Sequence, residues 1–182
     1  MTWRTRLMAC AAATLMAAVA MINDAQAAVV ELPDGSKADL SSQCPVCHMK
    51  AEAGTLGPAA VVLANGAVTV FDGPMDFFRF VLSAAQYGVS KADIKHLFVT
   101  DYAGKKFIDA TKAYYVVGSN VTSGMGPEPI PFSTREAAEK FKADHAGKAV
   151  LAYGEVAMDH LKPKRKMLKM EHEKPGKAGH NH

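Results

Sequence analysis

The residues of this sequence with the clearest capacity for chemistry lie in one hexapeptide, Cys-Pro-Val-Cys-His-Met, at positions 44–49. It holds two thiols, an imidazole and a thioether, and the chain has only 3 cysteines in 182 residues. Four kinds of site can be built on such a peptide: a disulfide, a redox-active dithiol, a structural zinc site, or a site for a softer metal ion.

A thiol–disulfide function is the first alternative. A disulfide between Cys44 and Cys47 closes a very small loop, so it would act as a switch more than as a stabilising crosslink. A thioredoxin-like dithiol lies at the N-terminus of a helix. Here residues 50–58 follow, and because they include Gly54, Gly57 and Pro58, we expect no helix there. The redox interpretation is disfavoured but stays open.

A structural zinc module is the second alternative. Zn²⁺ in such a site takes four protein ligands, usually with a second Cys or His pair downstream. No cysteine follows Cys47, and the spacing of His96 and His145 is uninformative. Either histidine could still complete a zinc site, so this alternative also stays open.

Cu(I) fits the donor set best, because this soft ion prefers thiolate and thioether ligands. Cys47 and Met49 are two positions apart, so in an extended segment their side chains project to the same face. Met125 is the candidate for a third soft donor. We therefore predict Cys47 as the essential thiolate, Met49 and Met125 as thioether ligands, and Cys44 and His48 as auxiliary ligands.

Met125 is a candidate because of its surroundings. It lies between two glycines in a long Pro/Gly-rich loop at residues 119–129. Leaving a large apolar side chain exposed there forgoes burial energy. The glycines would let the loop close over a metal ion and open again. The alternative is that Met125 folds back and fills a gap in the core.

The elements that must position these donors begin with a predicted hairpin. Asn65-Gly66 lies between two β-type runs and predicts a type I′ turn. Asp72 is expected to cap the following helix, with Pro74 in its first turn and Gly88 at its end. The predicted strands of this half are residues 59–64, 67–71 and 96–102.

The second half follows the same order. Ser133 and Glu136 predict a capping box that opens a helix to about His145, and Gly147 ends it. The predicted strands are residues 106–110, 113–118 and 149–156, and the Pro/Gly-rich loop leads to residues 130–132 before the helix. We therefore predict an α+β fold in which two similar ββαβ lobes form one compact domain.

The expected division of the chain has five parts. They are a signal peptide at 1–27, a segment with the metal motif at 28–58, a first lobe at 59–103, a second lobe at 104–158 and a tail at 159–182.

The first 27 residues have the layout of an export signal. Arg4 and Arg6 precede the apolar run 7–22, and Ala25-Gln26-Ala27 offers a cleavage site, so we expect a periplasmic protein that does not span the membrane. Cys10 lies at the front of the apolar run, where a lipid anchor is not expected.

The last residues differ in composition from the rest. Residues 159–182 hold seven Lys or Arg and three Asp or Glu, and we expect a disordered tail. Its methionines and histidines could collect metal: Met167, Met170, His172, His180 and His182. Because no basic face with interleaved aromatic residues occurs, nucleic-acid binding is not expected.

The sequence shows no pattern of an enzyme. It has no general acid–base pair, phosphate-binding loop or nucleophile triad. Asp72, Asp76 and Asp101 are interpreted as a helix cap, a solvated helix residue and a strand end. We predict a non-catalytic Cu(I) carrier.

Taken together, these motifs resemble the NosL family. The resemblance rests on the early C-x-x-C-x-Met, the Phe71-Asp72…Met75 helix start, the Asp101-Tyr102 strand end, the Met125-Gly126 loop and a closing Gly-x-Val strand, over about residues 43–156. It implies a fold of two ββαβ lobes and a copper chaperone that supplies Cu(I) for the copper-sulfide centre of nitrous oxide reductase. The implied partner is the apo enzyme or its maturation machinery, and we expect a monomer.

Two features depart from the family pattern. The family usually has Cys-Gly-Met, whereas this chain has Cys47-His48-Met49. Because a left-handed conformation is costly for a non-glycine residue, we expect the local backbone to differ at His48. The family is also commonly anchored through an N-terminal lipid, which is not expected here. These departures bear on the client enzyme more than on the metal.

Overall fold

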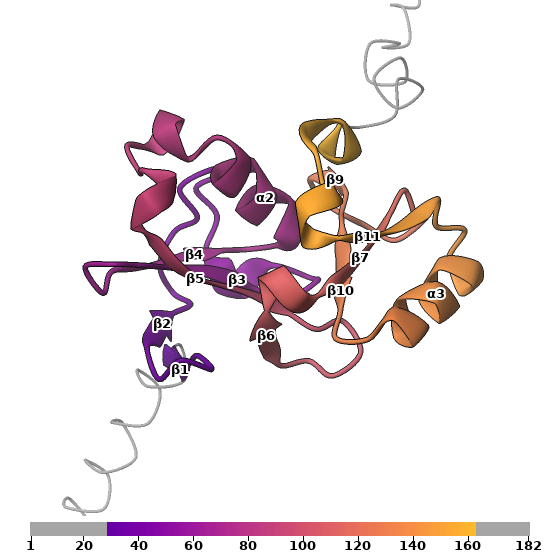
Figure 1. Cartoon of the computed structure of the whole chain (residues 1–182), viewed down its shortest axis with the longest axis horizontal. Helices are drawn as coiled ribbons and strands as arrows, with labels where there is room; N and C mark the ends of the chain where they lie inside the picture. The colour runs from indigo at the N-terminus through magenta and orange to yellow at the C-terminus, as the bar shows by residue number, and fades with distance from the viewer. Residues whose placement is uncertain (1–28, 163–182) are drawn as a thin grey trace, which may run out of the picture.

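The computed structural model describes residues 29–162, which form a mixed α/β fold with two main antiparallel sheets (Figure 1). The first sheet has the strand order β4-β3-β5-β6, and the second has the order β10-β7-β11. The first sheet and its short hairpin contain β1 (Val29–Glu31), β2 (Lys37–Asp39), β3 (Ala59–Leu63), β4 (Val68–Phe71), β5 (Ile94–Thr100) and β6 (Phe107–Asp109). The other strands are β7 (Tyr114–Val117), β8 (Thr122–Ser123), β9 (Gly126–Pro127), β10 (Ile130–Phe132) and β11 (Ala149–Ala152).

Two α-helices and several short 3-10 helices connect these strands. The α-helices are α2 (Pro74–Leu82) and α3 (Arg135–Asp144). The 3-10 helices are Ala51–Ala53, Ala84–Tyr87, Lys91–Asp93, Ala110–Lys112, Tyr153–Glu155 and Met158–Leu161. Within residues 29–162, no helix has both the length and the apolar character needed to cross a membrane.

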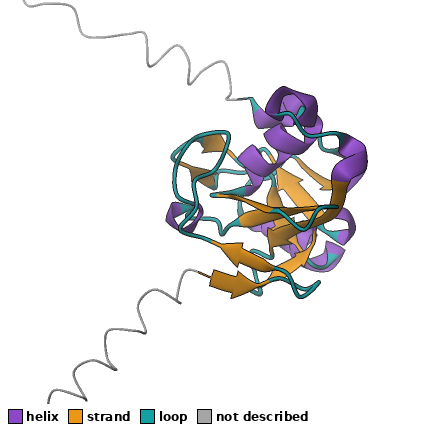
Figure 2. Cartoon of the chain, turned by 90° about the vertical axis from the view of Figure 1, so that its left-hand side faces the viewer, coloured by secondary structure: helices purple, strands orange, loops and turns teal. Residues whose placement is uncertain are grey.

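The first sheet is covered on both faces, as the alternation along β3 shows. Ala59 and Val61 pack into the core that includes the phenylalanines of α2, whereas Ala60 and Val62 pack against the β1-β2 hairpin. In Figure 2 this hairpin lies below the main strands and the helices lie above and beside them. Helix α2 is therefore fixed on one face of the sheet.

The second sheet joins the first through α2. The ring of Phe78 in α2 lies 4.8 Å from the ring of Tyr115 in β7, and both are buried in one cluster. On the far side, α3 packs Phe141 against Ile130 and Phe132 of β10. Helix α2 thus lies where the two sheets meet.

Three predicted boundaries are wrong. The strand near residue 107, expected in the second lobe, is β6 and pairs with β5 in the first sheet. The last strand ends at Ala152, because a 3-10 helix follows. The expected tail begins too early, since Leu161 is buried in the core beside α2. The predicted signal peptide and the tail residues 163–182 lie outside the described residues.

Local signals at the turn and the helix starts were also misassigned. Asn65 does not have the positive φ of a type I′ turn; only Gly66 does, at 85°, and the Asn65 side chain accepts a hydrogen bond from Ala67 N–H. The N-cap of α2 is Gly73 and not Asp72. The N-cap of α3 is Thr134, whose hydroxyl accepts from Ala137 N–H.

Candidate metal site

The hexapeptide at 44–49 folds into a tight turn. The N–H of His48 donates to the carbonyl of Cys44 over 2.9 Å, and the N–H of Cys44 donates to the carbonyl of Met49 over 2.8 Å. The expectation of an extended segment is therefore wrong. His48 has φ of 63°, so this histidine adopts the left-handed conformation after all, at a cost of about 1 kcal/mol.

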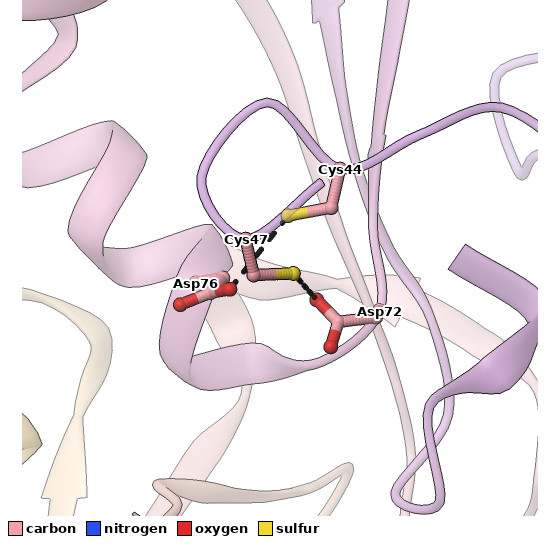
Figure 3. A group of neighbouring side chains, drawn as sticks. All are labelled: Cys44, Cys47, Asp72 and Asp76. Atoms are coloured by element: carbon pink, nitrogen blue, oxygen red, sulfur yellow. Dashed lines mark hydrogen bonds between the residues drawn. The ribbon is translucent and has the colours of Figure 1, made fainter. Parts of the chain in front are cut away.

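The turn directs both thiols toward two carboxylates at the start of α2 (Figure 3). The Sγ of Cys47 lies 3.2 Å from Oδ1 of Asp72, and the Sγ of Cys44 lies 3.7 Å from Oδ2 of Asp76. One atom from each of these four residues lies within 4.8 Å of the other three. The two cysteines are free thiols. The arrangement offers a cation two sulfur and two oxygen ligands.

Asp72 and Asp76 are the residues whose roles the sequence interpretation missed. Both are buried, and Asp76 also pairs with Arg79 over 2.9 Å. The two acids are four positions apart at the start of a helix, and this spacing places their side chains on the same side. From the sequence, each one was instead interpreted separately, as a helix cap and as a solvated residue. The interpretation of Asp76 as solvated is wrong. Asp101 is also buried, and it accepts hydrogen bonds from Ser133 and Gly104 N–H.

The thiols are held in their protonated form at neutral pH. Burial raises the pKa of Cys47, and the acceptor carboxylates Asp76 and Asp72 act in the same direction. Burial also raises the pKa of Cys44. A redox-active dithiol needs a thiol whose pKa is lowered, because the thiolate is the nucleophile. This environment therefore disfavours the thiol oxidoreductase alternative.

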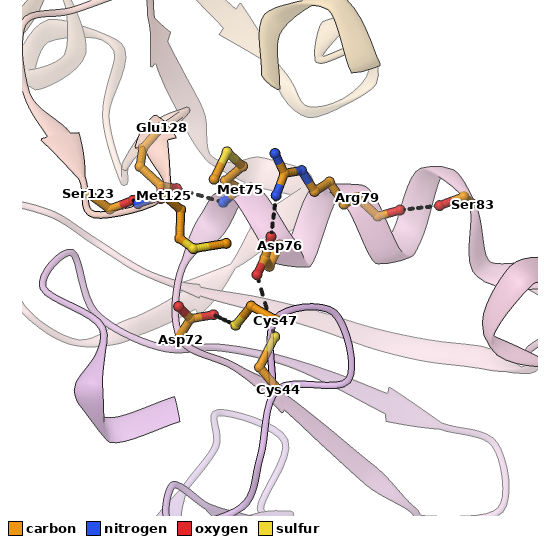
Figure 4. A network of polar contacts seen from close by, with 10 residues as sticks. All are labelled: Cys44, Cys47, Asp72, Met75, Asp76, Arg79, Ser83, Ser123, Met125 and Glu128. Carbon is orange, nitrogen blue, oxygen red and sulfur yellow. Dashed lines mark hydrogen bonds and ion pairs between the residues drawn. The ribbon is translucent and has the colours of Figure 1, made fainter. Parts of the chain in front are cut away.

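The two predicted thioether donors meet at one cavity. Met49 and Met125 are 40% and 37% exposed. Both line a cavity of about 290 Å³ together with Asp72 and Glu128. In Figure 4 the Met125 side chain extends from the β8-β9 turn toward the side on which Cys47 and Asp72 lie. Cys47 is not itself in the cavity lining, but Asp72 connects it to that cavity by a hydrogen bond.

The predicted histidines are not brought to this cluster. His48 is exposed and lies outside the four-residue group. His96 lies beside Asp34 and stacks on Phe98, and His145 stacks on Phe141. Neither His96 nor His145 therefore completes a zinc site with the two cysteines.

Glu128 is a third buried acid at the site, and no sequence signal pointed to it. Burial raises the pKa of Glu128, and the nearby Asp76 and Asp72 add to this effect. Among the described residues, the basic side chain that pairs with this group of acids is Arg79, which forms an ion pair with Asp76. The site is thus rich in negative groups, an electrostatic setting that favours a bound cation.

The backbone of Asp72 is positioned by a close approach of Gly54. A Cβ atom at residue 54 would lie 1.5 Å from the Asp72 carbonyl oxygen. Gly54→Ala is therefore expected to lower the free energy of unfolding by roughly 1–3 kcal/mol, measured by urea denaturation. The control is Gly154→Ala, whose Cβ would meet nothing within 4 Å. Equal stability of the two variants would contradict this packing.

The chain is similar in sequence and fold to known proteins. The NosL family model matches residues 36–161. The chain is similar to the crystal structure of the copper chaperone NosL from Shewanella denitrificans, with a TM-score of 0.56 and 26% identity, covering 66% of this chain and 93% of that one. It is also similar to the solution NMR structure of the apo-NosL protein from Achromobacter cycloclastes, with a TM-score of 0.43 and 30% identity, covering 57% of this chain and 87% of that one. No curated protein matches the chain.

Proposed function

Because the chain belongs to the NosL family, we propose that it carries Cu(I) on Cys47, Met49 and Met125, with Cys44 as an auxiliary ligand. The relative from Shewanella denitrificans is described as a copper chaperone. In this proposal the protein is a non-catalytic carrier that works in the periplasm. Its client is apo nitrous oxide reductase, the maturation machinery of that enzyme, or a similar cuproenzyme.

One observation carries the proposal: two thioethers from distant parts of the sequence line the same cavity beside the thiol pair Cys44 and Cys47. Met49 belongs to the 44–49 turn and Met125 to the β8-β9 hairpin, and Asp72 links their cavity to the Sγ of Cys47. Thiolate and thioether donors together select Cu(I) over harder cations.

The exposure of the thioethers suits a protein that hands its metal on. A buried, closed ligand set would retain the ion, whereas Met49 and Met125 are both exposed enough for a donor of the recipient to approach. Thioethers carry no proton, so a ligand on the recipient can replace them without a proton transfer. Cys44 is fully buried behind Cys47 and could keep the ion bound during this exchange.

A structural zinc module remains the second candidate, because the cluster of two thiols and two carboxylates favours it. Cys44, Cys47, Asp72 and Asp76 supply four ligand atoms, which is the number that structural zinc sites use. In such a module the metal supplies folding energy, so chelation unfolds the protein.

One experiment separates the carrier from its alternatives. The protein is purified under reducing, copper-replete conditions, and its metal content, free thiols and thermal midpoint with and without a chelator are measured. A Cu(I) carrier contains one copper per chain and stays folded after chelation. A zinc module contains zinc and unfolds, and a thiol oxidoreductase contains neither metal and cycles both thiols.

The raised pKa of the Cys47 thiol predicts that the affinity for Cu(I) depends on pH. Because Cys47 is protonated in the metal-free protein, Cu(I) binding must release its proton. The affinity for Cu(I) is therefore expected to rise by about tenfold per pH unit for each thiol proton released, and to fall as the pH is lowered. Competition titrations at pH 6, 7 and 8 measure this dependence. A pH-independent affinity would show that no thiol proton is displaced.

A further inference from the structure

Glu128 uses both of its carboxylate oxygens to connect two separate parts of the site (Figure 4). Its side chain belongs to a residue that is only 4% exposed. Oε1 accepts a hydrogen bond from the hydroxyl of Ser123 over 2.5 Å, and Oε2 accepts one from the N–H of Met75 over 2.7 Å. Glu128 thereby ties the β8-β9 hairpin to the first turn of α2.

The connection continues to the backbone of Met125. The Oγ of Ser123 also accepts a hydrogen bond from the N–H of Met125 over 3.1 Å. Met125 is therefore joined through Ser123 and Glu128 to the same helix start that carries Asp76. The hairpin has only two residues in each strand. An isolated two-stranded hairpin is marginally stable at best, so this one depends on tethering to hold a fixed position.

We propose that Glu128 is the positioning residue for the thioether of Met125, holding the β8-β9 hairpin over the thiol pair before the metal arrives. The inference rests on the proposed function. A tethered hairpin presents its thioether in place, whereas an untethered one must be ordered when Cu(I) binds, and that ordering lowers affinity.

The two ends of the connection can be tested separately. Ser123→Ala removes the hairpin end and leaves the bond from Met75 N–H to Glu128 intact. Glu128→Ala removes both ends and also leaves the N–H of Met75 without its acceptor. Glu128→Gln keeps one oxygen for Met75 N–H and offers an amide N–H to the Ser123 hydroxyl oxygen. The matched control is Thr122→Ala, an exposed position in the same strand.

The readouts are Cu(I) affinity by competition titration and the number of sulfur ligands by copper K-edge X-ray absorption. Ser123→Ala is expected to weaken Cu(I) binding by about tenfold, the equivalent of one lost hydrogen bond, and to lower the sulfur count. The thermal midpoint stays close to that of the Thr122→Ala control. Glu128→Ala shows the same loss of affinity, and Glu128→Gln restores most of it.

Making the same substitutions in a protein that already carries Met125→Ala shows whether they act through Met125. In a Met125→Ala protein, Ser123→Ala and Glu128→Ala are expected to cause no further loss of affinity, because the residue they position is absent. Unchanged affinity in Ser123→Ala, or an equal loss in the Met125→Ala background, would overturn the inference while leaving the proposed function in place. A wild-type protein that does not bind Cu(I) through sulfur would instead overturn the proposed function.

Discussion

Replacing Cys47 by Ser is expected to abolish tight Cu(I) binding, with an affinity at least about a hundredfold lower, since the loss of partners outside the ligand shell already costs about 10–100-fold. The serine hydroxyl can still donate to Asp72, so the fold is retained. Anaerobic competition titration measures the affinity, and thermal melting confirms that the variant is folded.

Cys44→Ser is the matched control for this experiment. Cys44 is fully buried, and its thiol faces Asp76 and not the cavity that Met49 and Met125 line. As an auxiliary ligand it should contribute less, so this variant is expected to keep measurable Cu(I) binding. Full, tight binding by Cys47→Ser would remove the basis of the ligand assignment.

Met125→Ala is expected to weaken Cu(I) binding by at least about tenfold, while the free energy of unfolding changes by no more than about 0.5 kcal/mol, as is usual for surface substitutions. The reason is that Met125 is 37% exposed at the tip of the β8-β9 turn and lines the cavity instead of filling the core. A Cu(I) competition titration and urea denaturation of the same variant measure both quantities.

Alanine variants of two other methionines, one exposed and one buried, are the controls for this result. Met158 is exposed and lies outside the lining of the cavity, so Met158→Ala is expected to change neither quantity. Met75 is buried in the core, and Met75→Ala is expected to cost about 2–5 kcal/mol of stability. If Met125→Ala behaves like Met75→Ala and keeps its Cu(I) affinity, Met125 is a packing residue and the three-donor site fails.

The parts of the fold that sequence could predict are those governed by neighbouring residues. The hairpin at Asn65-Gly66 and the helix that begins at Pro74 follow from turn chemistry and helical spacing. The predicted end of that helix at Gly88 is wrong, because α2 ends at Leu82 and Gly88 caps the 3-10 helix that follows it. The pairing of β6 could not be predicted in the same way, because a three-residue strand carries no information about which sheet it joins. Strand pairing is a property of the whole chain.

The candidate site likewise has residues that the sequence could identify and residues that it could not. The family resemblance inferred from the sequence is confirmed by the match over residues 36–161. Cys44 and Cys47 were identified because thiols are rare in this chain. Asp72 was misread as a helix cap because its true partner, Cys47, lies 25 positions earlier. Glu128 had no local signal at all, because it contacts Met75 across 53 positions.

The backbone at His48 is an instructive case. A left-handed conformation is costly for a histidine, yet His48 has a positive φ of 63°. The hydrogen bonds across the turn, from His48 N–H to Cys44 and from Cys44 N–H to Met49, fix this conformation. Their combined stabilisation offsets the local cost, because hydrogen bonds contribute about 0.5–1.5 kcal/mol each.

The most direct test of the copper assignment is copper K-edge X-ray absorption of the wild-type protein loaded anaerobically with one equivalent of Cu(I). We expect a Cu(I) ion with three sulfur neighbours, from Cys47, Met49 and Met125. A bound copper ion with one sulfur neighbour or none, coordinated mainly by nitrogen and oxygen, would contradict the account.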